Sequence, residues 1–223
     1  IVNPFRSLYI RELGASPVVL GLMNSTGRAV QAGIRLPGGH IADKYGRKKI
    51  VSAMTFGMAL SFLFYALAPS WEYVLIGVII ANISAVYFPA ITALEADSIP
   101  PDARGKGYAT IQIIPKILAV ASPVIAGVLV DRMGLLKGMR IGYVFVVLAF
   151  VIVALLRTFY LEETLENPQQ FDINELKDDV VTSITSIWGT WSILPRNLKA
   201  FIVAMSISGF AGPFYWTFSA IYA

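Results

Sequence analysis

The chain has 223 residues, of which 56% are hydrophobic and only 14% are charged, with 18 Lys and Arg against 14 Asp and Glu. A typical soluble domain carries roughly 25% charged residues, so this composition excludes a disordered chain and favours a protein of the lipid bilayer. The absence of Cys excludes disulfides and thiolate metal sites, and a single His excludes a His-based metal cluster within this sequence.

Apolar segments recur along the whole chain at the length that a membrane requires. A helix that crosses the ~30 Å hydrocarbon core needs about 20 mostly apolar residues. Residues 1–10 resemble the end of one such helix, and six whole or nearly whole spans follow at 17–39, 50–69, 73–94, 107–130, 141–160 and 200–223. The predicted fold is therefore an all-α bundle of transmembrane helices. Because the chain starts at Ile1 and its last span has no stop signal, we expect it to be a piece of a longer protein.

The links between these spans are short, with one exception. Four of them are expected at 40–49, 68–72, 96–106 and 131–140, whereas 161–199 forms a long loop. Apolar residues within the long loop recur at helical spacing: Val180, Ile184, Ile187, Trp188, Trp191 and Leu194. This pattern is typical of an amphipathic helix in the headgroup plane, and equally of a helix that packs on the ends of the bundle.

The distribution of basic residues predicts how the bundle is oriented. Alternation places loops 40–49, 96–106 and 157–199 on one side of the membrane, where they hold ten Lys and Arg. The opposite side holds five, namely Arg6, Arg11, Arg132, Lys137 and Arg140. Cytoplasmic loops carry the excess of Lys and Arg, so the first side is expected to face the cytoplasm of a plasma membrane. The surplus positive charge is thus a topology signal, and no nucleic-acid partner is expected.

Polar residues also lie inside two of the spans, where they are costly and often functional. At 100° per residue, Asn24, Arg28, Ala32, Arg35 and Gly39 fall on one helical face, bordered by Gln31. In the span 107–130, Tyr108, Gln112 and Lys116 share a face in the same way. Segment 141–160 is apolar on all sides until Arg157 and predicts a peripheral helix that faces lipid.

The last segment combines Gly209, Gly212 and Pro213 with several aromatic residues. Interrupted helices of this kind often mark transport sites, so we expect a break there, with aromatic rings beside it. The candidate residues of a substrate or ion pathway are Asn24, Arg28, Gln31, Gln112, Lys116, Phe210, Tyr215 and Trp216. The alternatives are a structural ion pair for Arg28 with an absent helix, snorkelling for Arg35, ordinary packing for the aromatic residues, and a solvated interfacial position for His40.

The loop 40–49 carries the strongest motif of the chain. Gly46 suits a tight turn, Gly39 suits close contact between helices, Asp43 can accept from backbone N–H groups or an Arg, and Arg47 to Lys49 suit anionic headgroups. The run from Gly39, the residue before this loop, to Lys49 resembles the signature that the major facilitator superfamily carries between its helices 2 and 3. Its defined positions are filled by Gly39, Asp43, Lys44, Gly46, Arg47 and Lys48.

Other stretches are similar to the same family. Asp97 to Gly105 resembles its helix 4–5 loop, and Ser122 to Gly127 resembles a degraded motif of its helix 5. The resemblance implies that 1–160 is an N-terminal transmembrane half with a partial helix 1, that 161–199 is the central cytoplasmic loop, and that 200–223 begins the second half. It further implies alternating access, with helices 1, 4 and 7 around a central cavity and helices 2 and 5 beside it. The residue that matches Asp43 helps to hold one end of the pathway shut in this family.

One departure concerns coupling. Many proton-coupled members carry an Arg in helix 4, but residues 73–94 contain none. Glu95 then remains a possible proton carrier, or else the partner of a salt bridge at the end of its helix. No cofactor or metal is expected. The sequence predicts a secondary active transporter of a small solute, and the charges of Arg28 and Lys116 lead to the hypothesis that this solute is anionic. A non-transporting sensor or assembly protein of the same fold is the first alternative, and a half-size channel formed by pairing copies is the second.

Overall fold

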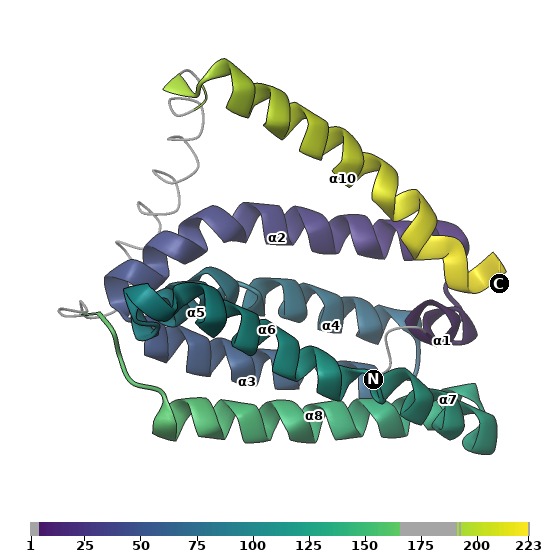
Figure 1. Ribbon diagram of the computed structural model, residues 1–223. Coiled ribbons are helices and arrows are strands. Elements are labelled where there is room, and N and C mark those ends of the chain that lie inside the picture. Colours follow the sequence, from purple (N-terminus) through teal and green to yellow (C-terminus); the bar gives the residue numbers. More distant parts are fainter. Residues whose placement is uncertain (1–4, 166–190, 192, 223) are drawn as a thin grey trace.

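The computed structural model describes residues 5–165, 191 and 193–222, and all the regular secondary structure in them is helical (Figure 1). The helices are α1 (Arg6–Glu12), α2 (Pro17–Tyr45), α3 (Arg47–Ala66), α4 (Trp71–Ser84), α5 (Tyr87–Ser98), the 3₁₀ turn η2 (Pro101–Ala103), α6 (Arg104–Ala119), α7 (Ser122–Met133), α8 (Leu135–Tyr160) and α10 (Arg196–Tyr222).

Four stretches of the described residues are long and apolar enough to cross a membrane. They are Arg47–Ala66, Trp71–Ser98, Pro101–Met133 and Leu135–Tyr160, close to four of the predicted spans. The predicted spans 17–39 and 200–223 correspond to α2, of 29 residues, and α10, of 27 residues, which are not among the four. In α2 the polar stripe around Arg28 lowers the hydropathy that a spanning helix needs.

Two of the four spans are interrupted upstream of a proline. The ring of a proline clashes with the carbonyl of the residue four positions earlier. For Pro89 that residue is Ala85, where α4 gives way to α5, and for Pro123 it is Ala119, where α6 ends. The freed carbonyls find other donors, since the backbone N–H of Phe88 donates to Ala85 O at 3.1 Å. Likewise, the Ser122 hydroxyl donates to Ala119 O at 2.8 Å.

Several expected boundaries were wrong. The predicted loops 40–49 and 131–140 are mostly helical, because a single glycine with positive φ separates the flanking helices in each case: Gly46 (φ 106°) and Gly134 (φ 79°). The break expected at Gly212 and Pro213 is absent, and α10 continues through both residues. Most of the predicted amphipathic stripe, from Val180 to Trp188, lies outside the described residues.

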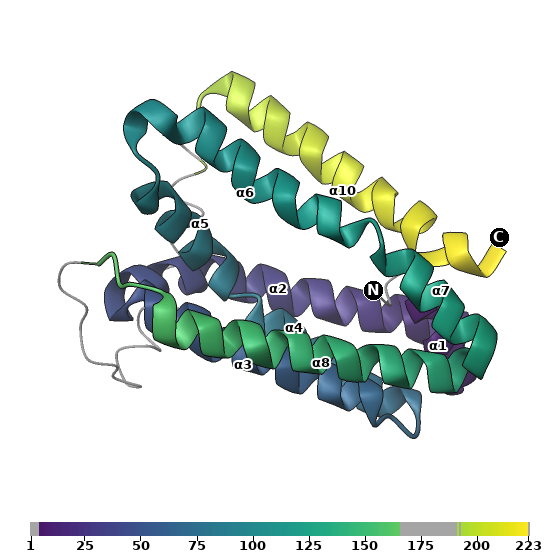
Figure 2. The ribbon, with the colours of Figure 1, turned by 60° about the horizontal axis from the view of Figure 1, so that its bottom comes forward.

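Helix α3 lies at the centre of the packing, against α8, α4 and α5, while α2 packs on α4 and α5. One buried cluster gathers the rings of Tyr9, Tyr65 and Tyr143. A second cluster, near the α2–α3 junction, is formed by Ala42, Val51, Tyr87, Ala90 and Leu94. As expected for a peripheral helix, α8 exposes one apolar face, which includes Phe145, Leu148, Ile152 and Phe159. In Figure 2, α6 lies apart from α2 and α4, and it contacts η2 and α7 at its two ends.

Candidate functional site

The α2–α3 junction brings the charges of loop 40–49 into fixed positions. Because Gly46 alone separates the two helices, Asp43 in the last turn of α2 and Arg47 at the start of α3 are four residues apart and adjacent in space. The Arg47 Nε donates to Asp43 Oδ1 at 2.9 Å, and Nη2 lies 2.9 Å from the same oxygen. Arg47 thus engages Asp43 with two of its nitrogen atoms.

Arg47 also reaches two segments that are distant in the sequence. Its Nη1 donates to a carboxylate oxygen of Asp97, one residue before the end of α5, and to the hydroxyl of Thr164 at 3.4 Å. The Arg47 side chain is only 16% exposed, whereas those of Asp43 and Asp97 are 59% and 48% exposed. A planar guanidinium with five donors suits such a junction, because it can serve several acceptors at once.

Glu163 binds the backbone of the same junction. Its Oε1 accepts from the N–H of Arg47 at 3.1 Å and from the N–H of Leu165 at 3.2 Å, and its Oε2 accepts from the N–H of Lys48 at 3.1 Å. The first N–H groups of a helix have no partner within the helix and carry partial positive charge. The Glu163 carboxylate therefore caps α3 from the segment that follows α8.

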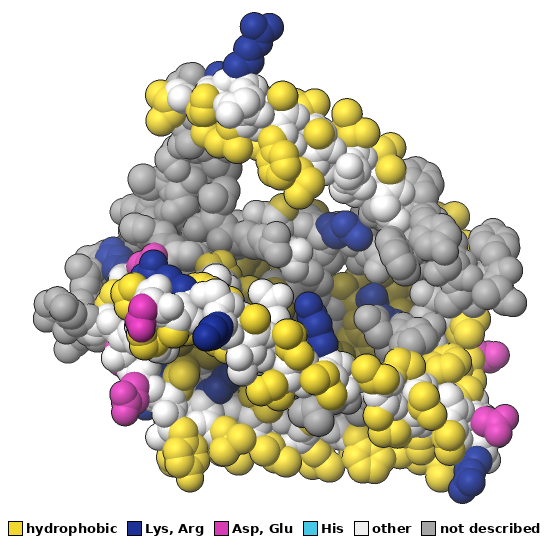
Figure 3. Space-filling model, viewed as in Figure 1, with side chains coloured by type: hydrophobic (Ala, Val, Ile, Leu, Met, Phe, Trp, Pro, Cys, Tyr) yellow, Lys and Arg dark blue, Asp and Glu magenta, His cyan; other side chains and the backbone are white. Residues whose placement is uncertain are grey.

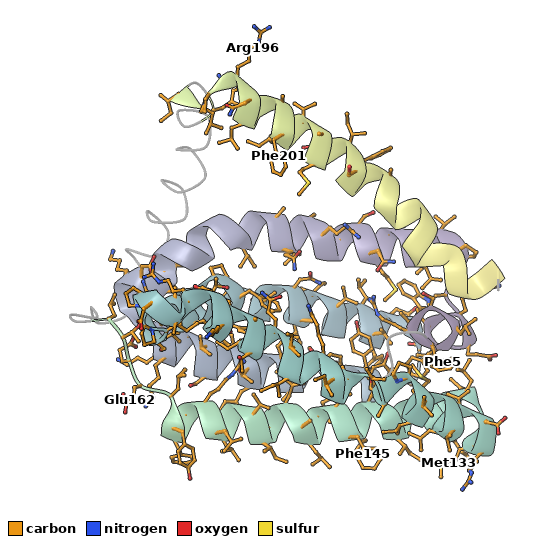
Figure 4. The ribbon with its side chains drawn as sticks, in the orientation of Figure 1. Phe5, Met133, Phe145, Glu162, Arg196 and Phe201 are labelled. Atoms are coloured by element: carbon orange, nitrogen blue, oxygen red, sulfur yellow. The ribbon has the colours of Figure 1, made fainter. Side chains whose placement is uncertain are left out.

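We name Asp43, Arg47, Asp97, Glu163 and Thr164 the Arg47 cluster. It joins the end of α2, the start of α3, the end of α5 and the segment after α8 at one end of the bundle. In Figure 4 the neighbouring Glu162 marks this end, and Met133 marks the opposite end. Asp43 and Asp97 bind the Arg47 guanidinium, and Glu163 binds the N-terminus of the same helix. Loss of one of these contacts should therefore alter the strength of the other two.

The other residues of the predicted gating motif have simpler surroundings. The ammonium of Lys44 lies 5.3 Å from the centre of the Tyr45 ring. Lys48 contributes its backbone N–H to Glu163. The close helix contact expected at Gly39 belongs instead to Gly38. A Cβ at Gly38 would lie 2.1 Å from Val86 Cγ2, whereas a Cβ at Gly39 would meet only Pro89 Cβ at 3.9 Å.

The predicted pathway residues of α2 and α6 lie on faces that the described helices leave open. Asn24 and Gln31 are half-buried, and Arg28 is exposed. Gln112 and Lys116 are exposed on α6. Arg28 and Lys116 form no ion pair within residues 5–165 or the described part of α10. The structure does not bring the two helices into contact along their length, so these residues form no compact site among the described residues.

The remaining candidates are less well defined. Phe210 is exposed on α10. The backbones of Tyr215 and Trp216 are helical, but their side chains, like those of Arg35 and His40, lie outside what the structure describes. A shallow recess of about 310 Å³ is lined by Leu8, Arg11, Glu12 and Leu135, and it contains none of the predicted pathway residues.

The two signs of charge are distributed differently along the spans. No Asp or Glu occurs within 13–42, 73–94 or 103–130, whereas Arg28, Arg35 and Lys116 occur there. Figure 3 shows Lys and Arg side chains in the hollow between α10 and the other helices, while the visible Asp and Glu side chains lie at the two ends of the molecule. Within 13–42 and 103–130, the polar faces of α2 and α6 therefore carry Lys and Arg and no Asp or Glu.

Sequence reasoning missed three members of the Arg47 cluster as partners of Arg47. Alternation of the spans places the segments of Asp97 and Glu163 on the same side as loop 40–49, so the sequence indicated that these two acids could reach Arg47. Nothing in the sequence indicated that Thr164 would contact it. The salt bridge considered for Glu95 is formed by Asp97 instead, and Glu95 is half-buried without an ion pair among the described residues.

Comparison with known proteins agrees with this arrangement. The model of the Major Facilitator Superfamily matches residues 1–223. A "Na(+), Li(+), K(+)/H(+) antiporter" of Planococcus maritimus is 30% identical over 173 residues, which cover 74% of this chain and 39% of the relative. The "Quinolone resistance protein NorA" of Staphylococcus aureus is 26% identical over 132 residues, 59% of this chain and 34% of the relative.

The chain thus spans well under half the length of these relatives. The family match, however, extends over every residue, and it agrees with the helical fold, the apolar spans and the motif at the α2–α3 junction. The family consists of multi-pass membrane transporters and not of enzymes. The chain belongs to the major facilitator superfamily.

Proposed function

We propose that the chain is the N-terminal part of a secondary active transporter that moves a small anionic solute across the plasma membrane by alternating access. In this proposal the Arg47 cluster is a gate at one end of the pathway. The observation that carries it is the contact of one guanidinium with Asp43 and Asp97, which ties α2 to α5 beside the α3 N-terminus.

The chemistry of the Arg47 cluster suits a contact that must form and break. Asp43 and Asp97 are about half exposed, and exposed ion pairs contribute only about 0–1 kcal/mol each. A gate held by several weak contacts can open when one of the helices moves, because no single contact is costly to break. Rocking of one half of the protein against the other supplies such a movement in this class of fold.

The proposed solute class rests on the interior charge. A base at the centre of a spanning helix costs about 2.5–3.5 kcal/mol on insertion scales. Arg28 and Lys116 carry this cost without an acidic residue anywhere in 13–42 or 103–130. A carboxylate or phosphate of a bound solute would offset it. Solutes with a net positive charge would add to it, unless helices outside this chain contribute acids.

The proposed division and orientation follow the sequence. Residues 1–160 form the first transmembrane half, 161–199 the central loop and 200–223 the first helix of the second half. The Arg47 end faces the cytoplasm, because the basic loops cluster there. The count that supports this orientation is ten Lys and Arg in 40–49, 96–106 and 157–199 against five on the opposite side.

The proposal is tested by solute flux into proteoliposomes that contain the full-length protein. A thermal-shift screen against carboxylates, phosphates and organic cations would first identify the probe. Uptake of the anion should fall at least tenfold in Arg28→Gln and in Lys116→Gln. Lys106→Gln is the matched control, because Lys106 is also an exposed base of α6 but lies in its first turn.

Four results decide between the candidates. Flux that depends on Arg28 and Lys116 supports the transporter of anions. Flux of a cation alone, unchanged by both substitutions, keeps the transporter and overturns the solute class. No flux for any solute, from protein whose ligands still shift its Tm, favours the sensor. A gene that ends near residue 223 would favour the half-size channel.

A further inference from the structure

One half-buried basic side chain of α8 contacts residues of two neighbouring helices. Arg157 lies in the last turn of α8, three residues before its end at Tyr160. Its Nη1 donates to the hydroxyl of Thr55 on α3 at 2.6 Å, and its guanidinium carbon lies 5.2 Å from the centre of the Tyr87 ring on α5. Arg157 of α8 therefore contacts both α3 and α5.

The direction of this side chain follows from the polarity of α8. Side chains on a helix lean toward its N-terminus. In Figure 4 the N-terminus of α8 lies beside Met133, at the end opposite Glu162 and the Arg47 cluster. Arg157 should therefore lean toward the membrane interior instead of snorkelling toward the nearer surface. Its acceptor Thr55 lies eight residues after Arg47, roughly 12 Å along α3 at 1.5 Å per residue.

The partners of Arg157 are uncharged but well suited to a cation. Thr55 is fully buried, and its hydroxyl donates to Val51 O at 2.6 Å, which leaves its lone pairs free to accept from Arg157. The Tyr87 ring is 7% exposed and offers the negative face of its π-system. A cation above an aromatic ring is held more strongly where water is excluded. No Asp or Glu pairs with Arg157 among the described residues.

Tyr87 occupies a sensitive place in the span. It is the first residue of α5, directly after the interruption that Pro89 imposes at Ala85. The N-terminal end of α5 is therefore not held by a continuous backbone ladder from α4. The opposite end of α5 carries Asp97, which binds Arg47. A contact that holds Tyr87 in place therefore also determines the position of Asp97 at the other end of α5.

We propose that Arg157 is a positioning residue, which clamps the start of α5 to α3 and α8 and thereby holds Asp97 in reach of Arg47. The clamp couples the peripheral helix α8 to the Arg47 cluster. The contacts that form the clamp are independent of the proposed gate, but its effect on transport rests on that proposed function. The ring of Tyr87 is required for the clamp, and its hydroxyl is not.

The 223 residues contain no Cys, so spin labels can be attached at Cys residues introduced into them, once any Cys elsewhere in the full-length protein has been replaced by Ser. Spin labels at Ser98 and Leu148, both exposed, report the position of α5 relative to α8. Labels at Leu22 and Leu148 report α2 relative to α8 and serve as the control pair, because α5 is not involved. Distances are measured by pulsed electron spin resonance in reconstituted protein with no solute present.

The substitutions separate the ring from the rest of Tyr87. In Tyr87→Leu and in Arg157→Met, the ratio of molecules with the native Ser98–Leu148 distance to molecules with any other distance should fall about tenfold. Tyr87→Phe should leave it unchanged, because the ring face remains. The ratio for Arg157→Lys should lie between those of the wild type and Arg157→Met, because Lys keeps the charge but not the planar guanidinium. The double variant Tyr87→Leu, Arg157→Met should shift the population no further than either single one, because the two residues form one contact.

Equal effects of Tyr87→Phe and Tyr87→Leu, or an equal change at the Leu22–Leu148 pair, would overturn the clamp. The second result would mean that the whole bundle loosens. Shifted Ser98–Leu148 distances with unchanged solute flux would support the clamp and contradict the gate of the proposed function. Reduced flux with unchanged distances would overturn the clamp and leave the transporter standing.

Discussion

The carboxylate of Glu163 accepts a hydrogen bond from the backbone N–H of Arg47 at 3.1 Å, although 116 positions separate the two residues. The second carboxylate oxygen accepts from Lys48 N at 3.1 Å. The segment after α8 is thus bound to the first turn of α3, at the residue whose side chain also holds Asp43 and Asp97. A movement of the segment after α8 and an opening of the proposed gate would therefore break contacts of the same residue, Arg47.

The capping contact predicts a specific loss of stability. Glu163→Ala should lower the free energy of unfolding by about 1–2 kcal/mol, because it leaves the first N–H groups of α3 without an acceptor and removes an anion from a helix N-terminus. Thermal unfolding of the full-length protein in detergent measures this change. Glu162→Ala is the matched control, since Glu162 is exposed and makes no contact of this kind. Equal effects of the two variants would contradict the cap.

The ion pair of Arg47 predicts a loss of turnover without loss of the protein. Asp97→Asn and Asp43→Asn should each shift the conformational balance toward the state open at the Arg47 end and lower solute flux several-fold, while membrane insertion stays intact. The reason is that a neutral amide binds the guanidinium less strongly than a carboxylate does. Flux is compared with Asp102→Asn, whose carboxylate is exposed on η2. Solute flux in Asp97→Asn equal to that of the wild type would contradict the proposed gate.

Arg47→Lys tests whether geometry or charge matters at this junction. A lysine keeps the positive charge but cannot serve Asp43 and Asp97 through a planar fork. Flux should therefore fall about as much as in Asp97→Asn, even though the net charge is unchanged. Lys49→Arg, at an exposed base two residues away, is the control. If Arg47→Lys transports like the wild type, the cluster acts through charge alone.

Much of this fold follows from patterns that a single sequence contains. Apolar length predicts the spans, and Gly46 predicts the turn, because only glycine readily adopts its φ of 106°. The same logic misjudged the length of the link at 40–49. One glycine suffices to reverse the chain there, so α2 extends to Tyr45 and brings Asp43 within one helical turn of Arg47.

Contacts between distant segments are harder to predict, because they depend on how the helices pack. Nothing in the local sequence of Glu163 indicates that it caps α3, and Arg157 resembles an ordinary interfacial base at the end of an apolar helix. The packing of α3 against α8 and α5 is what brings Thr55 and Tyr87 to it. The predicted pathway residues are the opposite case, because polar stripes predict them from the sequence but the packing of the described helices does not bring them together.

The choice between Gly38 and Gly39 is decided by packing in the same way. Gly38→Ala should destabilise the protein by about 1–3 kcal/mol, because the added methyl group would overlap the stiff, branched side chain of Val86. Gly39→Ala should cost much less, since its methyl group would make ordinary contact with Pro89. The Tm values of the two variants provide the comparison. A larger fall in Tm for Gly39→Ala than for Gly38→Ala would mean that the close helix contact lies at Gly39, as the motif predicts.

The two tyrosines of the aromatic cluster predict opposite responses to the loss of a hydroxyl. The Tyr9 hydroxyl donates to Tyr65 O at 2.7 Å, so Tyr9→Phe should cost about 1 kcal/mol and leave a buried carbonyl with one acceptor site unfilled. The Tyr143 hydroxyl is buried and has no hydrogen-bond partner among the described residues. Tyr143→Phe should therefore leave the Tm unchanged or raise it, because the cost of burying an unpaired polar group is removed. The two rings lie 5.5 Å apart between centroids, and neither substitution removes a ring, so both variants should keep this packing. A fall in Tm for Tyr143→Phe as large as that for Tyr9→Phe would show that the Tyr143 hydroxyl has a partner, such as a buried water.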